Sequence, residues 1–529
     1  MTRTSTTSVF LPLLAAAGSV LAGSIQLPGL KLPKDAATHR AAVKEIFTTA
    51  YGTYKEKAWG HDDLAPLSGA PNDPRNGFGA TIIDSLSTMK VMGLNDLFAE
   101  GVEFAKAIDF SESKTDSTVS VFETTIRFLG GLLSAYELGG KKDKALLTKA
   151  QEVADKMSFA WVGDNAMPYG FLNFTTNTPT VAGSNIAEAG TLILEWSRLS
   201  ELTKNNTYRD LAEKSFRHIA TWNDTLLPGL PGQCINPTTG EWNCRYITWG
   251  GGSDSYFEYL IKYARLSNNK DPLWVETWKT AVDSTASVLI HKSTVGNHTF
   301  VADYDDSKRV RTIGSHLGCF IGGNWIMGGK LIGNETIVNW GLELVDGCIA
   351  TYNTSTGIGP EVFAYATATS NYTGVDATAD DLDYYNDHGF YVYNGAAYYD
   401  LRPEVMESNL YAWRTTGNKK YYDNAVKFIG SLNATAVGGA NAGIGDVRQT
   451  AYGESGFFDD TESFFFAEVL KYLYLHFADP KDMSLDDYVF NTEAHPLRAP
   501  KALPSYEPSD STSSSSDDSE TSTSAKFRM

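Results

Sequence analysis

Apolar residues recur at helical spacing along most of the chain. The segment 122–137 has apolar residues at successive steps of four, three and four, namely Phe122, Ile126, Leu129 and Leu133. These steps are the spacing of one helix face. Seven stretches of this kind follow one another, beginning near Asp84, Phe122, Glu188, Asp254, Gly322, Glu404 and Glu462. The intervals between them are about 40 to 80 residues, so each has room for an inner helix, a return helix and loops.

Several of the predicted inner helices are apolar on nearly every side. The clearest is the segment 463–475, Ser-Phe-Phe-Phe-Ala-Glu-Val-Leu-Lys-Tyr-Leu-Tyr-Leu. A helix of this kind is normally enclosed by other helices. Seven repeated helix pairs with enclosed inner members indicate a ring of inner helices inside a ring of outer ones. The pattern therefore predicts an all-α fold, an (α/α)7 barrel, in a single large domain.

The two ends of the chain differ from the middle. Residues 1–22 are typical of a signal peptide, with Arg3, a short apolar stretch and the small-residue site Val20-Leu21-Ala22. Residues 23–35 contain Pro and Gly and are predicted to be a linker, and 36–498 are predicted to form the (α/α)7 domain. Residues 499–529 become rich in Ser, Thr and Asp, which predicts a disordered tail. Outside the signal, no segment is apolar enough to span a membrane.

Composition and charge narrow the class of protein. The hydrophobic fraction is 42%, enough for a sizeable core, and the formal net charge is −19. This negative charge argues against nucleic acid as a partner, because proteins that bind nucleic acids normally carry a basic stripe. Eight sites match the N-glycosylation pattern: Asn173, Asn205, Asn223, Asn297, Asn334, Asn353, Asn371 and Asn433. Together with the signal they predict a secreted glycoprotein, and we expect a monomer.

The chain has four cysteines, Cys234, Cys244, Cys319 and Cys348. In an oxidising compartment four cysteines allow two disulfides in three connectivities. A zinc site made by them is disfavoured, because no pair has the short Cys-x-x-Cys spacing.

Four carboxylates lie inside otherwise apolar or aromatic segments: Glu123, Asp254, Glu404 and Glu468. Taken singly, an acidic residue near a helix start is a cap or a partner of the helix dipole. Four unpaired charges on neighbouring inner helices would be costly unless they shared a polar pocket. Glycoside hydrolysis uses such a set, in which one carboxylic acid protonates the leaving oxygen and one carboxylate activates water or attacks directly.

Seven ordered motifs carry a family resemblance. They are Phe122-Glu-Thr-Thr-Ile-Arg127, Gly250-Gly-Gly-Ser-Asp-Ser-Tyr-Phe-Glu-Tyr-Leu260, His316-Leu-Gly-Cys-Phe320, Gly359-Pro-Glu361, Leu401-Arg-Pro-Glu-Val-Met-Glu-Ser408, Ser463-Phe-Phe-Phe-Ala-Glu468 and Phe490-Asn-Thr-Glu-Ala-His-Pro496. From about residue 36 to 498 the chain resembles the class I α-1,2-mannosidases of glycoside hydrolase family 47, and its secreted fungal members most closely. The resemblance implies an inverting, Ca2+-dependent exo-mannosidase with an (α/α)7 barrel, acting on high-mannose N-glycans.

The resemblance also implies roles for individual residues. Glu123 matches the proton donor and Glu404 the general base, while Asp254 and Glu361 match further catalytic carboxylates. Thr492 matches the calcium ligand. The substrate-binding and pocket residues that match are Arg127, His316, Arg402, Glu407, Phe464, Glu468 and Glu493. Glu468 and Glu493 are expected to hold waters of the calcium ion, and Phe464 to stack under the sugar ring, although aromatic residues in such a run are otherwise core.

Two further details follow from the resemblance. Cys319 and Cys348 match a structural disulfide. Cys234 and Cys244 bracket a Pro/Gly turn, where a second, local bridge is an open alternative to two free thiols. Endoplasmic-reticulum members that remove a single mannose carry arginine two residues before the barrel aspartate, where this chain has Gly252. A roomier pocket predicts broad trimming of α-1,2 linkages.

Two other functions compete with this interpretation. A non-hydrolytic, mannose-binding quality-control lectin would share the fold, but such relatives generally lack the Cys319 and Cys348 pair. A polysaccharide lyase built on an αα barrel is the second alternative, and the ordered motifs argue against it.

Overall fold

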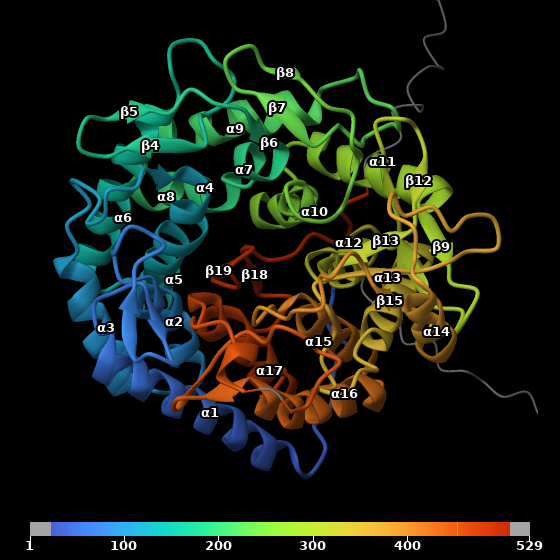
Figure 1. Ribbon diagram of the computed structural model, residues 1–529. Coiled ribbons are helices and arrows are strands. Elements are labelled where there is room, and N and C mark those ends of the chain that lie inside the picture. Colours follow the sequence, from blue (N-terminus) through green and yellow to red (C-terminus); the bar gives the residue numbers. More distant parts are fainter. Residues whose placement is uncertain (1–22, 452, 508–529) are drawn as a thin grey trace, which may run out of the picture.

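The computed structural model describes residues 23–451 and 453–507. The predicted signal peptide at 1–22 and the greater part of the predicted tail, 508–529, lie outside the described residues. Figure 1 shows the helices arranged as two concentric rings. Helices form because the apolar stretches identified above bury one face or all faces against neighbouring helices.

Seven helical segments form the inner ring of the described chain. They are α2 (Ala80–Val91); α4 (Val121–Glu123) continuing through η1 (Thr124–Leu129) into α5 (Gly130–Leu138); α7 (Ile186–Gly190) with α8 (Ile193–Thr203); α10 (Asp254–Ser267); α12 (Ile321–Ile332); α15 (Glu404–Thr416); and η6 (Phe465–Val469) with α17 (Leu470–Phe477). The segments η1 and η6 are wide, π-type turns. Such turns are frequent at functional sites.

Seven further helices form the outer ring. They are α1 (Ala36–Lys57), α3 (Asn95–Ala107), α6 (Lys144–Met157), α9 (Asn206–Ala220), α11 (Leu273–Val288), α13 (Glu335–Ala350) and α16 (Lys419–Ser431). Within the part of the chain that the structure describes, α14 (Ala379–His388) lies outside both rings. The last inner segment, η6 with α17, packs against the first, α2, and so closes the ring. The predicted (α/α)7 barrel is confirmed.

Short strands occupy the connections between helices. They are β1 (Asp63–Ala65), β2 (Ala70–Asn72), β3 (Val119–Ser120), β4 (Phe171–Asn173), β5 (Thr178–Pro179), β6 (Ser184–Asn185), β7 (Cys234–Asn236), β8 (Glu241–Trp242), β9 (Ile290–Lys292), β10 (Thr299–Val301), β11 (Asp303–Tyr304), β12 (Val310–Arg311), β13 (Ile313–Ser315), β14 (Val362–Ala364), β15 (Tyr391–Val392), β16 (Ala436–Val437), β17 (Ala440–Asn441), β18 (Tyr488–Phe490) and β19 (Pro496–Arg498). Their pairings are antiparallel, in sheets of two or three strands. The fold is thus mostly helical rather than free of strands.

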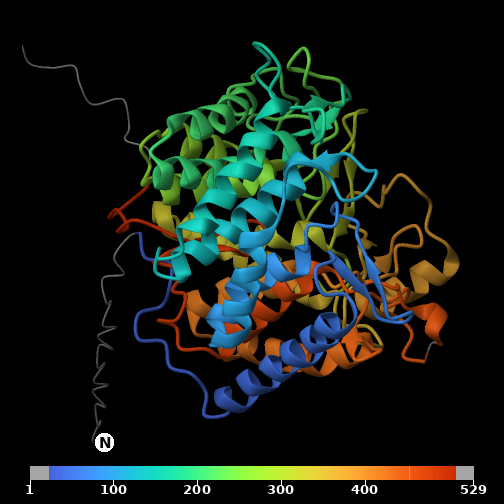
Figure 2. The same ribbon diagram turned by 90° about the vertical axis from the view of Figure 1, so that its left-hand side faces the viewer.

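The hairpin of β18 and β19 has a position of its own, inside the inner ring (Figure 1). Phe490 pairs with Pro496, so the residues 491–495 form its tip. Strand β18 packs against α10 and β19 against α5. In the side view of Figure 2 the red C-terminal segment reaches the left side, whereas most of the other strand-bearing loops extend to the right. The hairpin therefore fills the barrel from one end and leaves the other end for a cavity.

The described ends pack on the barrel beyond the predicted domain limits. Ile25, in the predicted linker, is buried, and its N–H donates to Asp486 Oδ1 at 2.6 Å. Tyr506, in the predicted tail, is also buried, and its hydroxyl donates to Asn268 Oδ1 at 2.6 Å. Apolar side chains at these positions explain the difference, since each buries surface that a free linker or tail would leave in water.

Two disulfides join the described cysteines. Cys319 is bonded to Cys348, which links the short turn just before α12 to the end of α13, as the resemblance implies. Cys234 is bonded to Cys244 across the β7–β8 hairpin. Among the described residues, no helix has the length and apolar character needed to cross a membrane.

Candidate active site

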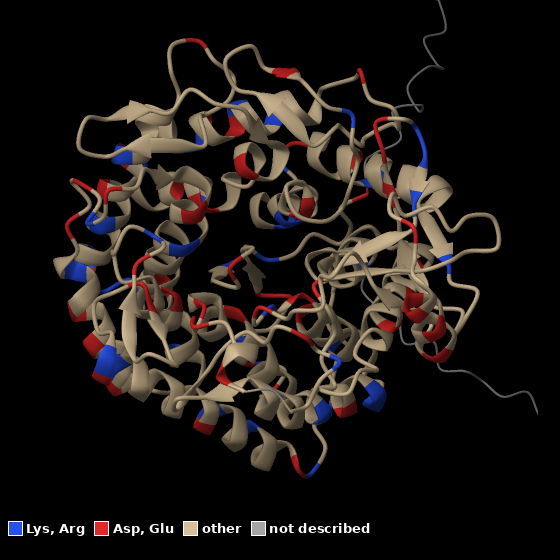
Figure 3. Cartoon of the chain, in the orientation of Figure 1, with Lys and Arg blue, Asp and Glu red and all other residues tan. Residues whose placement is uncertain are grey.

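A cavity of about 320 Å³ opens at the centre of the inner ring. In Figure 3 several of the acidic positions, coloured red, lie on the parts of the inner segments nearest the centre of the ring. Its walls come from five inner segments and from the tip of the C-terminal hairpin. The predicted site residues that line it are Glu123, Arg127, Asp254, Arg402, Glu404, Glu407, Phe464, Glu468, Thr492 and Glu493. Chain positions from 123 to 493 thus meet in one pocket, because each of these five segments contributes residues near its first turn.

Arg127 connects three acidic residues at one side of the cavity. Its Nε donates to Glu123 Oε2 at 2.7 Å, one helical turn away, and its Nη1 donates to Glu493. The buried carboxylate of Asp84 lies 3.4 Å from the same Nη1. Burial acts to raise the pKa of Glu123, but the charges of Arg127 and then Arg75 outweigh it, and this pKa is lowered. Glu123 is therefore ionised in the free protein.

Phe464 lies beside the same guanidinium group. Its ring centroid is 5.5 Å from Arg127 Cζ, a distance typical of cation–π contact. Phe464 is mostly buried, yet it lines the cavity. The aromatic face is thus fixed in orientation by a neighbouring charge, as a platform for a sugar ring requires.

Glu404 is the first residue of α15, and its carboxylate contacts a histidine on the side away from the cavity. His316 Nδ1 lies 2.8 Å from Glu404 Oε2, and His316 Nε2 lies 2.8 Å from the Tyr352 hydroxyl. His316 does not line the cavity itself. Burial acts to raise the pKa of Glu404, but the hydrogen bond and charge of His316 together with Arg402 leave it lowered. Glu404 is thus ionised and oriented.

Asp254 begins α10 and differs from the other two carboxylates. Its Oδ1 accepts hydrogen bonds from the N–H of Ser255 at 2.8 Å and from the Ser255 hydroxyl at 3.3 Å. Burial dominates and raises the pKa of Asp254 to about 7, with smaller contributions from Glu258 and Glu404. A carboxyl group with this pKa holds a proton in weakly acidic solution.

Glu361 lies behind the cavity wall. Both of its oxygens accept hydrogen bonds from Arg402 Nε, at 2.8 and 2.6 Å, and Arg402 lines the cavity. Leu401, next to this arginine, has a φ of 54°, which is rare for a large branched side chain. Strain of this kind concentrates at functional sites. Glu361 therefore contacts the pocket through Arg402.

Two acidic residues of the cavity were missed by the sequence analysis as site residues, Glu188 and Glu258. Glu258 forms an ion pair with Lys262 one turn further along α10, and Lys262 Nζ lies 3.7 Å from Glu407. Both partners are almost fully buried. A Glu–Lys pair at this spacing resembles an ordinary surface pair of a helix, so its burial could not be read from the sequence. The signal that could have found it is its position one turn after Asp254.

The floor of the cavity offers only oxygen ligands. Thr492, at the tip of the hairpin, has a hydroxyl and a carbonyl oxygen, and Glu468 and Glu493 lie with it in the same lining. Burial raises the pKa of Glu468 well above its usual range, and the charges of Glu493, Glu404 and Glu407 raise it further. A bound divalent cation would relieve this repulsion, and calcium prefers such oxygen ligands. The residues present therefore fit the expected calcium ion.

A second acidic group could also hold a metal ion. It consists of Asp63, Asp460 and Glu462, whose carboxylate oxygens lie within 4.8 Å of one another. Arg75 already forms ion pairs with two of them, with Asp63 at 2.6 Å and with Glu462. Its guanidinium group thus supplies positive charge that a metal would otherwise bring.

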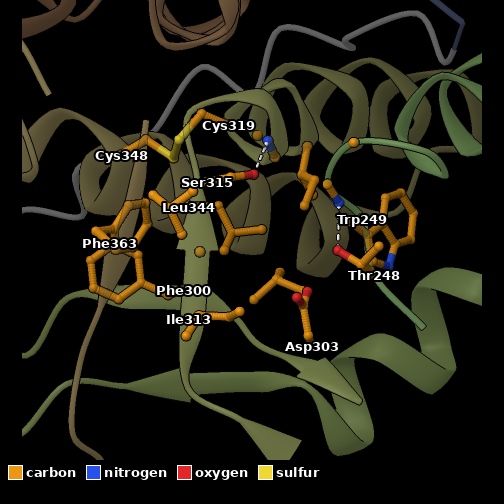
Figure 4. Close-up of a pocket in the computed structure, with 18 of the residues that line it drawn as sticks. Thr248, Trp249, Phe300, Asp303, Ile313, Ser315, Cys319, Leu344, Cys348 and Phe363 are labelled. Carbon is orange, nitrogen blue, oxygen red and sulfur yellow. Dashed lines mark hydrogen bonds between the residues drawn. A yellow bond between two sulfur atoms is a disulfide. The ribbon is translucent and has the colours of Figure 1, made fainter. Parts of the chain in front are cut away.

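Figure 4 shows a separate cavity, with a volume of about 270 Å³. Gly251 lines both. Its walls are mostly apolar, with Phe300, Phe363 and the Cys319–Cys348 bond, and its carboxylate, Asp303, accepts a hydrogen bond from Tyr246 at 2.5 Å. This cavity has a single carboxylate among its described lining residues, so of these two cavities it is the central one that contains the pair needed for glycoside hydrolysis.

Comparison with known proteins decides the family. The family model described as Glycosyl hydrolase family 47 matches residues 46–499. The chain belongs to glycosyl hydrolase family 47. The resemblance found in the sequence motifs is thereby confirmed, and the family match spans both the helical rings and the C-terminal hairpin.

Individual family 47 proteins are similar over nearly their whole length. A probable mannosyl-oligosaccharide α-1,2-mannosidase 1B of Aspergillus clavatus is 38% identical over 520 residues, covering 92% of this chain and 99% of the relative. The corresponding protein of Aspergillus phoenicis is 38% identical over 504 residues, covering 90% and 94%. The solved structure of an α-1,2-mannosidase from Trichoderma reesei superposes with a TM-score of 0.83 at 36% identity, covering 88% and 99%.

Proposed function

We propose that the protein is a mannosyl-oligosaccharide α-1,2-mannosidase that removes terminal α-1,2-linked mannose from high-mannose N-glycans with inversion and with a calcium ion at Thr492. The family and the named activity of the fungal relatives support the glycoside hydrolase part. The observation that carries the mechanism is the contrast between two neighbouring carboxylates of one cavity: Glu404 is held ionised, whereas Asp254 has a pKa of about 7.

Glu404 is the general base of the proposal. Its lowered pKa keeps it ionised in mildly acidic solution, and His316 fixes its orientation by the 2.8 Å contact. An inverting enzyme needs such a carboxylate to take a proton from the attacking water. Arg402 lies beside it in the lining and is itself held by Glu361.

The acid of the proposal is Asp254. The resemblance assigns proton donation to Glu123, but Arg127 and Arg75 favour the ionised form of that residue. Asp254 carries a proton below pH about 7 and can give it to the glycosidic oxygen that leaves. Glu123, ionised beside Arg127, then contributes negative charge close to a developing oxocarbenium ion.

Thr492, with Glu468 and Glu493 around it, would hold the calcium ion. A calcium ion there supplies a fixed positive charge that binds sugar hydroxyls and water. The cavity residues position the sugar against it: Phe464 offers a ring face, and Arg127 joins Glu123 to Glu493. We further propose that trimming is broad, because Gly252 leaves the entrance beside Asp254 without a long side chain.

The protein is proposed to act as a secreted monomer. Two disulfides among the described residues are consistent with passage through the secretory pathway. The alternative function, a non-hydrolytic lectin, is disfavoured because the cavity contains two carboxyl groups whose pKa values are shifted in opposite directions, as an acid and a base require.

The test is hydrolysis of α-1,2-mannobiose followed by proton NMR, with and without a chelator, beside Glu404→Gln as the inactive control. We expect β-mannose to appear first and its release to stop when calcium is removed. Initial release of α-mannose would refute inversion, and full activity in chelator would refute the calcium site. Binding of the disaccharide without hydrolysis would favour the lectin.

A further inference from the structure

The tip of the C-terminal hairpin is held from two sides by buried hydrogen bonds. The N–H of Thr492 donates to the Tyr259 hydroxyl at 3.2 Å. That hydroxyl donates in turn to Glu195 Oε1 at 2.6 Å. Glu195 lies on α8 and Tyr259 on α10, and neither side chain is exposed. Two inner helices thus reach the tip through one hydroxyl group.

The same carboxylate oxygen holds the residue before Thr492. Asn491 Nδ2 donates to Glu195 Oε1 at 2.7 Å and to the carbonyl of Ile126 at 2.9 Å. Asn491 Oδ1 accepts the N–H of Glu493 at 3.0 Å. Thr492 therefore has one peptide group on its N-terminal side, fixed by Tyr259, and one on its C-terminal side, fixed by Asn491. Tyr259 and Asn491 both donate hydrogen bonds to Glu195 Oε1.

We propose that Tyr259 and Glu195 are positioning residues for the calcium ion, because they fix the two peptide groups that flank Thr492. This inference rests on the calcium site of the proposed function. The carbonyl oxygen of Thr492 belongs to the peptide group whose N–H is bound by Asn491, so its direction is set by this network. Partners that orient a metal ligand commonly account for a factor of about 10 to 100 in metal affinity.

Tyr259→Phe removes the hydroxyl and keeps the ring, which tests the network with little change of volume. We expect the calcium dissociation constant of chelator-stripped protein, measured by isothermal titration calorimetry, to rise about 10- to 100-fold. The rise in melting temperature caused by a fixed, subsaturating calcium concentration should shrink in parallel. Glu195→Gln keeps an oxygen acceptor for Tyr259 and Asn491. Its calcium dissociation constant should therefore stay within about threefold of that of the wild type.

Tyr256→Phe is the matched control. Tyr256 lies on the same helix and is fully buried, and its hydroxyl has no hydrogen-bond partner among the described residues. The calcium affinity of Tyr256→Phe should equal that of the wild type. If wild-type protein binds no calcium, the calcium part of the proposed function fails. If wild-type protein binds calcium and Tyr259→Phe matches Tyr256→Phe in affinity, the positioning role is overturned, even if Tyr259→Phe melts at a lower temperature without calcium.

Discussion

His316 Nδ1 lies 2.8 Å from Glu404 Oε2, although the two residues are 88 positions apart in the chain. The histidine follows strand β13, and the glutamate is the first residue of α15. The contact joins a residue outside the cavity to one inside it. The imidazole thus sets both the direction and the ionisation of the carboxylate that we assign as base.

Removal of this histidine should shift the acidic side of the pH profile. In His316→Ala the hydrogen bond that lowers the pKa of Glu404 is lost while burial remains, so that pKa rises. Glu404 then becomes ionised only at higher pH, and kcat/KM at low pH falls. Tyr352→Phe, which removes only the outer contact at 2.8 Å, should have a smaller effect. An acidic limb that stays in place in His316→Ala would contradict the role of the histidine.

Asp254→Asn should change the alkaline side of the profile. If Asp254 is the acid, we expect the wild type to lose activity as the pH rises through about 7, where Asp254 loses its proton. We expect kcat to drop by roughly 10²- to 10⁴-fold, the usual contribution of an acid or base group. If Glu123 is the donor instead, Asp254→Asn keeps the limb near neutral pH, and Glu123→Gln alone removes it.

Asp254→Asn, which should lower activity, should raise the stability of the folded protein at alkaline pH. The pKa of Asp254 is raised from 3.8 to about 7 on folding, so the folded state favours the protonated form. The resulting destabilisation is absent below pH about 4, grows as the pH rises towards 7 and is complete above it. Asp254→Asn should therefore melt above the wild type at pH 8 and level with it at pH 4, by calorimetry at both pH values.

Gly252→Arg should narrow the set of products. Gly252 has a φ of +87°, and a Cβ there would lie 2.4 Å from Gln233 Nε2. Backbone strain of this kind costs about 1–3 kcal/mol. Chromatography of a nine-mannose oligosaccharide digest should show complete α-1,2 trimming by the wild type and an early stop by the variant. Gly252→Ala shares the strain without the long side chain, so equal product patterns for both variants would attribute the effect to strain alone.

The two disulfides should differ in their contribution to stability. They close loops with sequence separations of 29 for Cys319–Cys348 and 10 for Cys234–Cys244. The chain-entropy relation gives about 3.6 and about 2.7 kcal/mol, respectively. Double serine variants, unfolded in guanidinium chloride, should lose free energy of unfolding in that order. The reverse order would show that native contacts rather than loop length decide the difference.

The sequence predicts the helical rings well because burial repeats in every unit. Two inner helices begin at the residues where the apolar stretches begin, Asp254 and Glu404. The strands were not predicted, since segments of two or three residues are too short to show alternation. They form where loops cross the barrel end, which depends on tertiary contacts.

The candidate site was predictable as a set of residues but not as layers around a cavity. Glu361 and His316 belong to recognisable motifs, yet they lie behind Arg402 and Glu404 rather than in the lining. Asp84, by contrast, belongs to none of the recognised motifs, yet it contacts residues of the site. It is buried and contacts both Ser463, at 2.6 Å, and His495, at 3.3 Å. Partners that distant in the chain leave no local pattern.

The hairpin inside the barrel also means that residues near the end of the described chain complete the pocket. Thr492 and Glu493 lie near the end of the described chain, and their partners Tyr259 and Arg127 are synthesised hundreds of residues earlier. Contacts of such long sequence separation require the closure of a large loop, which slows their formation. The pocket can therefore be completed only after residues 491–495 have been synthesised and packed into the ring, so we expect a chain truncated before the hairpin to lack part of the pocket although it holds Asp254 and Glu404.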